Sequence, residues 1–151
     1  MRTFQFGDSQ SVLKTLEEIV ELLAENNYAK AFDLFAEHKY FKYTPEELKD
    51  TIETYLEEKE PKNIVTSAFS ATDLLPYKMQ SLESEYDDFI SVVHAQFPYC
   101  VAWNIEDDKY IGNYAHADLP INGKWSDLTL KFLFDEDDDK CWLVLEDVEV
   151  M

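Results

Sequence analysis

The chain contains few residues of several kinds, and each shortage excludes a class of function. Its 151 residues include three glycines, two cysteines, three histidines and, among 13 basic residues, a single arginine. With glycine only at Gly7, Gly112 and Gly123, the sequence has neither a glycine-rich phosphate loop nor a G-x-S-x-G nucleophile elbow. Nucleotide-dependent chemistry of the usual sort is therefore excluded. One arginine is also poorly suited to bidentate clamping of phosphates.

Positive charge is the next shortage. The 32 acidic residues against 13 basic ones give a formal net charge of -19. The chain lacks the basic face that nucleic acids and anionic membranes attract, so we predict that it binds neither. It also lacks an apolar N-terminal region and any run near the roughly 18 apolar residues of a membrane span. These absences predict a cytoplasmic protein.

Apolar residues are nevertheless abundant. Hydrophobic residues make up 46% of the chain and aromatic residues 15%, which is not the composition of a disordered acidic tail. At this length one core can bury roughly 70% of the unfolded chain's surface, so neither a metal nor a disulfide is needed. We predict a single domain over residues 1–151, with a helical part at 9–60, a connector at 61–87 and a sheet part at 88–151.

The helical part shows the three-and-four spacing of apolar residues. This spacing runs from Val12 to Leu23, after the N-cap candidates Asp8 and Ser9. The residues Thr44-Pro45-Glu46-Glu47 form a capping box with proline at the first helical position. The sequence predicts three helices: one over the Val12–Leu23 stripe, one from Tyr28 to about His38, and one from Pro45 to just before Pro61. The connector then offers a short strand at Asn63–Thr66 and a turn at Thr72–Pro76.

After Asp88 the period of the apolar residues changes from the 3.6 of a helix to the 2 of a strand. The predicted strands are Phe89–Ala95, Tyr99–Ile105, Tyr110–Ala117, Leu128–Phe134 and Trp142–Val150. Their connectors are Phe97–Pro98, Glu106–Lys109, Pro120–Gly123 and Asp135–Lys140. Connectors this short suit antiparallel neighbours. We therefore predict an α+β domain in which three N-terminal helices pack on one face of a curved antiparallel β-meander of about four to six strands.

The acidic run at residues 135–139 imitates a calcium loop. Asp135, Asp137, Asp139 and Glu146 fall at positions one, three, five and twelve of an EF-hand spacing. Lys140, however, occupies the position where that loop needs glycine, and both flanking segments have strand patterns. The favoured interpretation is a hairpin loop whose charges are solvated.

The histidines and cysteines give weaker signals. No histidine stands in an H-E-x-x-H pattern or beside a cysteine pair, so zinc is not predicted. His116 with Asp118 could form an acid-base pair, and a partly exposed sheet histidine is the alternative. Cys100 and Cys141 lie in apolar runs, where reduced buried thiols are expected. A cross-strand disulfide or a reactive thiol remain alternatives.

Acidic and aromatic residues occur side by side in the predicted turns. Tyr and Trp anchor protein interfaces, and neighbouring carboxylates orient a basic partner, although many aromatics simply fill a core. For the acidic role we predict Asp87, Asp88, Glu106, Asp107, Asp108, Asp135, Glu136, Asp137, Asp138 and Asp139. For the aromatic anchors we predict Tyr86, Tyr110 and Trp125.

Three resemblances follow from these residues. The segments Asp118-Leu119-Pro120, GKWSDLTL at 123–130 and WLVLEDVEV at 142–150 resemble an uncharacterised family of small bacterial domains that end in an S-D-L-T-L strand and a D-hydrophobic-x-V strand. The residues Glu25–Ala31 look like the opening of the cone-shaped fold shared by nuclear transport factor two and ketosteroid isomerase, which implies helices lining a curved sheet around a pocket. In size, acidity and class the chain resembles immunity proteins of toxin systems such as contact-dependent growth inhibition.

We therefore predict a non-enzymatic acidic binding protein, most simply an immunity protein that neutralises a basic, nuclease-like toxin domain, because complementary charge speeds association. The first alternative is a cone-fold ligand-binding or enzymatic domain with His94, His116 and Asp118 near a pocket. The second is a nucleic-acid mimic that inhibits a DNA-processing enzyme. We predict no catalytic residues, no cofactor and no metal, and the oligomeric state does not follow from the sequence.

Overall fold

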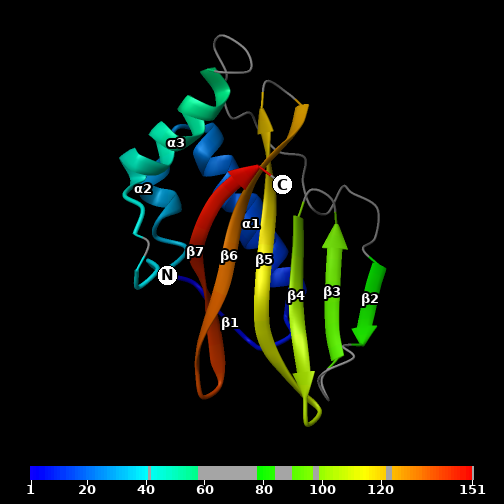
Figure 1. Cartoon of the computed structure of the whole chain (residues 1–151). Helices are drawn as coiled ribbons and strands as arrows, with labels where there is room; N and C mark the ends of the chain where they lie inside the picture. Colours follow the sequence, from blue (N-terminus) through cyan, green and yellow to red (C-terminus); the bar gives the residue numbers. More distant parts are fainter. Residues whose placement is uncertain (41, 58–77, 84–89, 97–98, 122–123, 151) are drawn as a thin grey trace.

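A computed structural model describes residues 1–40, 42–57, 78–83, 90–96, 99–121 and 124–150. The helices are α1 (Ser9–Ala24), α2 (Tyr28–Ala31) and α3 (Pro45–Glu57). The strands are β1 (Thr3–Phe4), β2 (Lys78–Glu83), β3 (Ile90–Gln96), β4 (Tyr99–Glu106), β5 (Lys109–Ile121), β6 (Lys124–Asp137) and β7 (Lys140–Val150). Figure 1 shows these elements in chain order.

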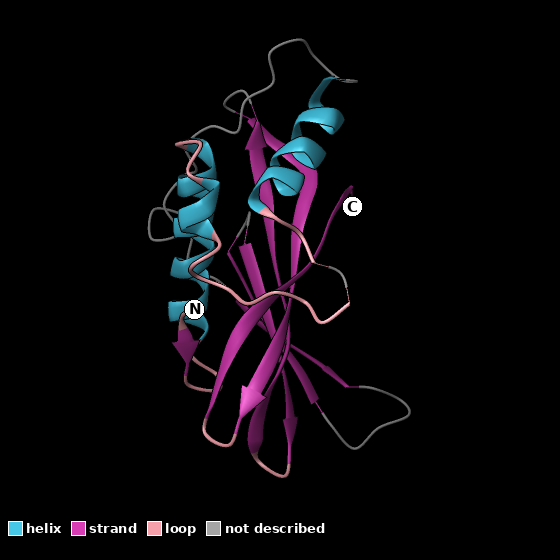
Figure 2. Ribbon diagram, turned by 90° about the vertical axis from the view of Figure 1, so that its left-hand side faces the viewer, coloured by secondary structure: helices cyan, strands magenta, loops and turns pink. Residues whose placement is uncertain are grey.

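The strands form one antiparallel sheet in the order β1-β7-β6-β5-β4-β3-β2. From β2 to β7 every strand pairs with its neighbour in sequence, so this part is a six-stranded meander. Figures 1 and 2 show that the long strands curve. The predicted α+β class and curved antiparallel sheet are confirmed. The predicted Asn63–Thr66 strand, Thr72–Pro76 turn and Phe97–Pro98 connector lie outside the described residues.

The sequence predicts neither β1 nor β2. β2 lies in the segment predicted as a connector, where its six residues lack a regular alternation. The two-residue β1 pairs with β7 through Thr3↔Trp142 and Phe4↔Cys141. Next to it, the Ala36 N–H donates to the carbonyl of Leu143 at 2.8 Å. β1 and Ala36 together cover part of the β7 edge. The paired residues are more than 100 positions apart in the sequence, so the local periodicity of apolar residues does not predict their contact.

α1 is the helix that the sequence predicts best. The Asp8 side chain accepts a hydrogen bond from the Ser11 N–H and caps the helix, as expected. The apolar stripe from Val12 to Leu23 is buried. The helix ends at Ala24, between the predicted Val12–Leu23 stripe and the next predicted helix. Just after it, Asn26 has a φ of 61°, a conformation that asparagine tolerates better than most residues.

The other two helices differ in how far they extend. α2 ends at Ala31, so the predicted extension to about His38 is wrong. Residues after it leave the helix because Ala36 is hydrogen-bonded to β7 instead. The Thr44 hydroxyl accepts from the Glu47 N–H at 3.1 Å, which confirms the predicted cap of α3. Each of the helices formed by the described residues is too short or too polar to cross a bilayer.

The core lies between α1 and the sheet. α1 contacts β4 and β5, whereas α3 contacts β7 at the margin of the sheet. Figure 1 accordingly shows α1 behind β4 and β5, with α2 and α3 beside β7. Val101, Ala115, Phe132 and Leu145 follow one another across four strands and are all buried. This row identifies the inner face of the sheet, and alternate residues face outward.

Candidate functional site

The tips of two neighbouring hairpins enclose a groove. It has a volume of about 720 Å³ and lies between the β4–β5 and β6–β7 hairpins. We call it the hairpin groove, and its lining residues are Phe6, Glu106, Asp107, Lys109, Tyr110, Ile111, Glu136, Asp137 and Asp138. Five carboxylates against one ammonium group leave a formal charge of -4. Six of the residues predicted for partner binding line this groove.

The β4–β5 hairpin closes more tightly than predicted. Glu106 pairs with Lys109, so the turn consists of Asp107 and Asp108 alone rather than the four predicted residues. Their φ angles are 50° and 61°. A two-residue turn with both φ angles positive is the type I′ turn, which matches the twist of the strands and normally favours Asn-Gly. Two adjacent aspartates are therefore a departure from the most stable turn chemistry.

The β6–β7 hairpin is also longer than expected. Asp135, Glu136 and Asp137 belong to β6, and only Asp138 and Asp139 form the turn, so the predicted connector Asp135–Lys140 is too long. Strand pairing continues through these charged residues, because the backbone hydrogen bonds between the strands do not depend on side-chain polarity. The Asp137 carboxylate accepts a hydrogen bond from the Asp138 N–H at 2.8 Å. This contact holds one groove carboxylate at the base of the turn.

The aromatic part of the groove is joined to the core. The Tyr110 ring meets Trp103 edge-on, with centroids 6.4 Å apart, and Trp103 stacks on Phe134 at 4.8 Å. A Cβ on Gly7 would come within 3.0 Å of the Tyr110 ring, and one on Gly112 within 2.5 Å of Phe134. Both glycines therefore permit close packing that a larger residue would prevent. The side chain of Trp103 is fully buried.

Sequence reasoning missed Phe6, Gly7 and Gly112 as parts of this site. A signal was present for Gly112, because glycine inside a strand often marks a bulge or a close approach. The register between β4 and β5 indeed shifts between Ala102 and Trp103, next to the pair Trp103↔Gly112. No comparable pattern in the sequence points to Phe6.

The remaining predicted binding residues divide into two sets. Asp108, Asp135 and Asp139 belong to the same two hairpins but do not line the groove. The residues Tyr86, Asp87 and Asp88 lie outside the described residues, as does the side chain of Trp125. The structure thus brings together the acids of the two hairpin tips with Tyr110.

The three residues of the predicted pocket do not converge. His94 pairs with Val101 of the buried row and so lies on the inner face. His116 pairs with Cys100 and Lys131 at the alternate positions and lies on the outer face. Asp118 accepts a hydrogen bond from Thr129 at 2.7 Å. Because the two histidines face opposite sides of the sheet, they cannot share one pocket with Asp118.

His94 instead joins α1 to the sheet. The Trp103 indole N–H donates to the Ser9 Oγ at 2.9 Å, and the Ser9 Oγ also contacts the His94 Nδ1. Since the indole can only donate, the Ser9 hydroxyl proton is available to the imidazole. Burial lowers the pKa of His94 below its ordinary value, which favours the neutral ring that this hydrogen bond needs. Ser9 is 3% exposed, so it is a structural hydroxyl inaccessible to a substrate.

His116 has a different environment. It stacks on Tyr114 with centroids 4.6 Å apart. Burial and the nearby Lys131 lower its pKa, while Asp118 opposes the shift. The neutral form is thus favoured, as in a partly exposed sheet histidine.

Cys100 and Cys141 are both free; Cys141 is buried and Cys100 is half-buried. The part of the chain that the structure describes contains no group of three or more His, Cys, Asp or Glu side chains suited to a metal ion. The EF-hand spacing falls on two paired strands and a two-residue turn.

Comparisons of the chain with protein-family models, with curated proteins and with solved structures found no match.

Proposed function

We propose that the protein binds a basic protein partner through the hairpin groove. The observation that carries the proposal is the groove itself, in which five carboxylates of two hairpins surround a tyrosine that is packed against the core. Carboxylates on exposed tips attract a positively charged partner over a distance, and an aromatic ring provides contact area once the partner has docked.

The turn chemistry supports the proposal. Asp107 and Asp108 occupy a turn that Asn-Gly would form more favourably. Departures from local preference are expected at functional sites, so we infer that the charge of this turn serves binding. In the same proposal the three helices shield one face of the sheet and leave the hairpin tips open to the partner.

The partner class that fits this charge is a basic toxin domain with nuclease activity, and the protein would then be its immunity protein. An immunity protein must capture its toxin quickly, and charge complementarity raises association rates by orders of magnitude. The product of the neighbouring gene is the first partner to test. Expressed alone it should arrest growth, and co-expression of this protein should restore growth.

The experiment that tests the groove uses matched triple variants. Glu106→Gln, Asp107→Asn and Asp137→Asn remove three groove charges. The control removes three exposed charges from α3 by Glu46→Gln, Asp50→Asn and Glu53→Gln. The wild type and the control should each co-purify with a basic protein, and the groove variant should not. Equal recovery of the protein by all three forms would refute the groove as the binding site.

The same experiment separates an immunity protein from a nucleic-acid mimic. A mimic would occupy the DNA-binding surface of its target, so DNA should compete with it for the captured partner. The immunity proposal predicts instead that the captured partner is toxic when expressed alone.

A further inference from the structure

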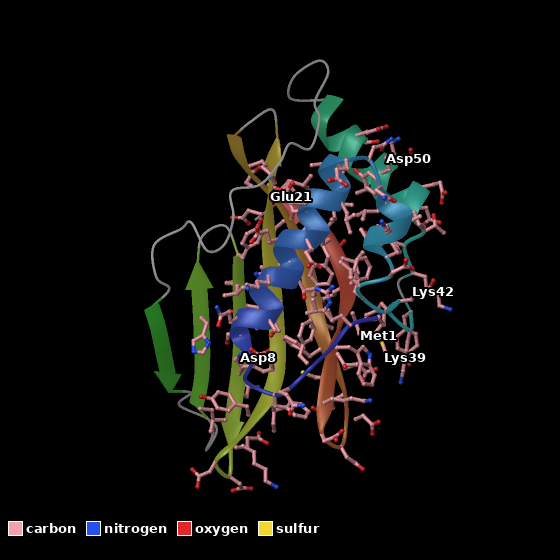
Figure 3. The ribbon with its side chains drawn as sticks, turned by 180° about the vertical axis from the view of Figure 1, so that it is seen from behind. Met1, Asp8, Glu21, Lys39, Lys42 and Asp50 are labelled. Atoms are coloured by element: carbon pink, nitrogen blue, oxygen red, sulfur yellow. The ribbon has the colours of Figure 1, made fainter. Side chains whose placement is uncertain are left out.

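A second groove lies on the helical side of the molecule, away from the hairpin tips. It has a volume of about 460 Å³ and is lined by Glu17, Glu18, Glu21, Leu22, Lys30, Asp33 and Leu34, which we call the helix groove. Figure 3 looks onto α1 from this side, with Asp8 at one end of the helix and Glu21 toward the other. The helix groove and the hairpin groove share no residue.

The exposed surface of the helix groove is mainly apolar, although five of its seven lining residues are charged. Leu22 of α1 and Leu34 after α2 are half-buried and pack against the core, so each leaves part of its side chain accessible. Aliphatic stems of the charged residues extend this apolar surface. The volume is in the range of ligand pockets and accommodates a few side chains of a partner.

The rim of the helix groove is acidic. Four carboxylates against the single ammonium of Lys30 leave a formal charge of -3. One carboxylate of this rim already binds a cation of the same chain: the Arg2 guanidinium lies 2.6 Å from the Glu18 carboxylate. The backbone N–H of Arg2 also donates to the carbonyl of Leu34 at 3.3 Å, which links the two walls of the groove. An apolar floor with an acidic rim is complementary to apolar side chains flanked by cations.

From this complementarity we propose that the helix groove binds a basic amphipathic helix of a partner protein. One apolar side chain of that helix lies between Leu22 and Leu34, and its lysine or arginine side chains lie beside Glu17, Glu21 and Asp33. A helix in a groove presents such side chains at i, i+3, i+4 and i+7. This inference stands independently of the hairpin groove and its partner.

The test is an NMR titration of the full chain with synthetic peptides. The probe is an end-blocked peptide of about 15 residues, composed of leucine and lysine with leucine at helical spacing. A control peptide has the same composition with leucine and lysine in strict alternation. The helical peptide should shift the methyl signals of Leu22 and Leu34. The alternating peptide should bind about tenfold more weakly, since it cannot place its apolar face along the groove.

Matched variants distinguish peptide binding in the helix groove from a general attraction of the basic peptide to an acidic protein. Leu34→Gln should weaken the helical peptide about tenfold, because the contact with an apolar side chain is lost. Leu133→Gln changes a leucine on β6 that is also half-buried and should leave the affinity unchanged. Leu22→Gln provides a second groove variant, and circular dichroism verifies that each variant is folded.

Charge is tested separately. Glu21→Gln with Asp33→Asn should lower the salt dependence of peptide binding, whereas Glu37→Gln with Asp50→Asn, two exposed acids outside the groove, should not. Tyr110→Ala should bind the peptide like the wild type, which distinguishes this inference from the proposed function. The inference is overturned if both peptides bind equally, if methyl shifts concentrate at the hairpin tips, or if folded Leu34→Gln and Leu22→Gln variants retain full affinity.

Discussion

The ring of Tyr110 lies directly over Gly7, so closely that a Cβ on Gly7 would come within 3.0 Å of two ring carbons. Gly7 has a φ of 84°, a region that residues with a side chain rarely adopt. The segment that precedes α1 therefore supports one face of the tyrosine, and Trp103 meets its ring from the core. The ring of Tyr110, which we propose as the aromatic anchor of the hairpin groove, is thus held in place by its contacts with Gly7 and Trp103.

We predict that Gly7→Ala destabilises the protein by about 1–3 kcal/mol, because it combines an unfavourable φ with a contact against the Tyr110 ring. Denaturant unfolding measures this loss. Gln10→Ala, an exposed change in α1, is the control and should alter the unfolding free energy by less than about 0.5 kcal/mol. A Gly7→Ala protein as stable as the control would contradict both the strain at this φ and the close contact with the Tyr110 ring.

Replacing Asp107-Asp108 by Asn-Gly should have opposite effects on stability and binding. The type I′ turn then has its preferred residues and loses two adjacent charges, so we expect stabilisation of about 0.5–1 kcal/mol. Partner binding should weaken, since one groove carboxylate and a neighbouring charge are removed. Thermal unfolding and co-purification measure the two effects. A variant that gains stability and keeps full binding would show that the aspartates are dispensable for function.

Stability should decrease as the pH falls from 7 to 5. The pKa values of His94 and His116 are lowered in the folded protein, so the unfolded chain takes up protons first as the pH passes its ordinary histidine pKa of about 6.5. The stability contributed by the neutral histidines is complete above that pH and is lost below it. His94→Gln should reduce the pH dependence of the unfolding free energy, and adding His116→Gln should reduce it further. An unchanged slope in the double variant would contradict this assignment.

Both thiols should react slowly in the folded protein. Burial raises the pKa of Cys100 to about 11 and that of Cys141 to about 12, which keeps the reactive thiolate scarce near pH 8. A disulfide reagent such as Ellman's reagent should modify neither cysteine rapidly until denaturant is added, and then both. Rapid modification of Cys100 in native buffer would indicate an activated thiol and revive the alternative of a reactive cysteine.

The elements that the sequence predicted well are those whose signals are local. α1 follows from its apolar stripe and the Asp8 cap, and α3 from the Thr44 cap. The end of α2 could not be predicted from local signals. Ala36 forms hydrogen bonds with β7 instead of continuing the helix, and β7 lies more than 100 residues further along the sequence. β1 depends on the same edge of β7. Such pairings are set by tertiary structure, and the periodicity of apolar residues does not predict them.

For the candidate site, the sequence predicted the positions of the charged residues better than the shape of the groove that they line. The sequence predicts turns at Glu106–Asp108 and Asp135–Asp139, and the structure places these acids on two adjacent hairpins. That these hairpins enclose a groove with Phe6 depends on the order of the strands and the curvature of the sheet. The sequence also did not show that His94 and His116 lie on opposite faces of the sheet, because the faces of two separate strands are matched only by the strand register.

The central claim is that the hairpin groove attracts a basic partner through its charge, and the association rate tests it most directly. Stopped-flow measurements with the captured partner, from about 0.05 to 0.5 M salt, compare the wild type with the two triple variants. The account predicts a steep fall of the wild-type rate with salt, a clearly shallower fall for Glu106→Gln, Asp107→Asn and Asp137→Asn, and a wild-type slope for the α3 control. A rate that ignores salt, or equal slopes for both triple variants, would contradict it.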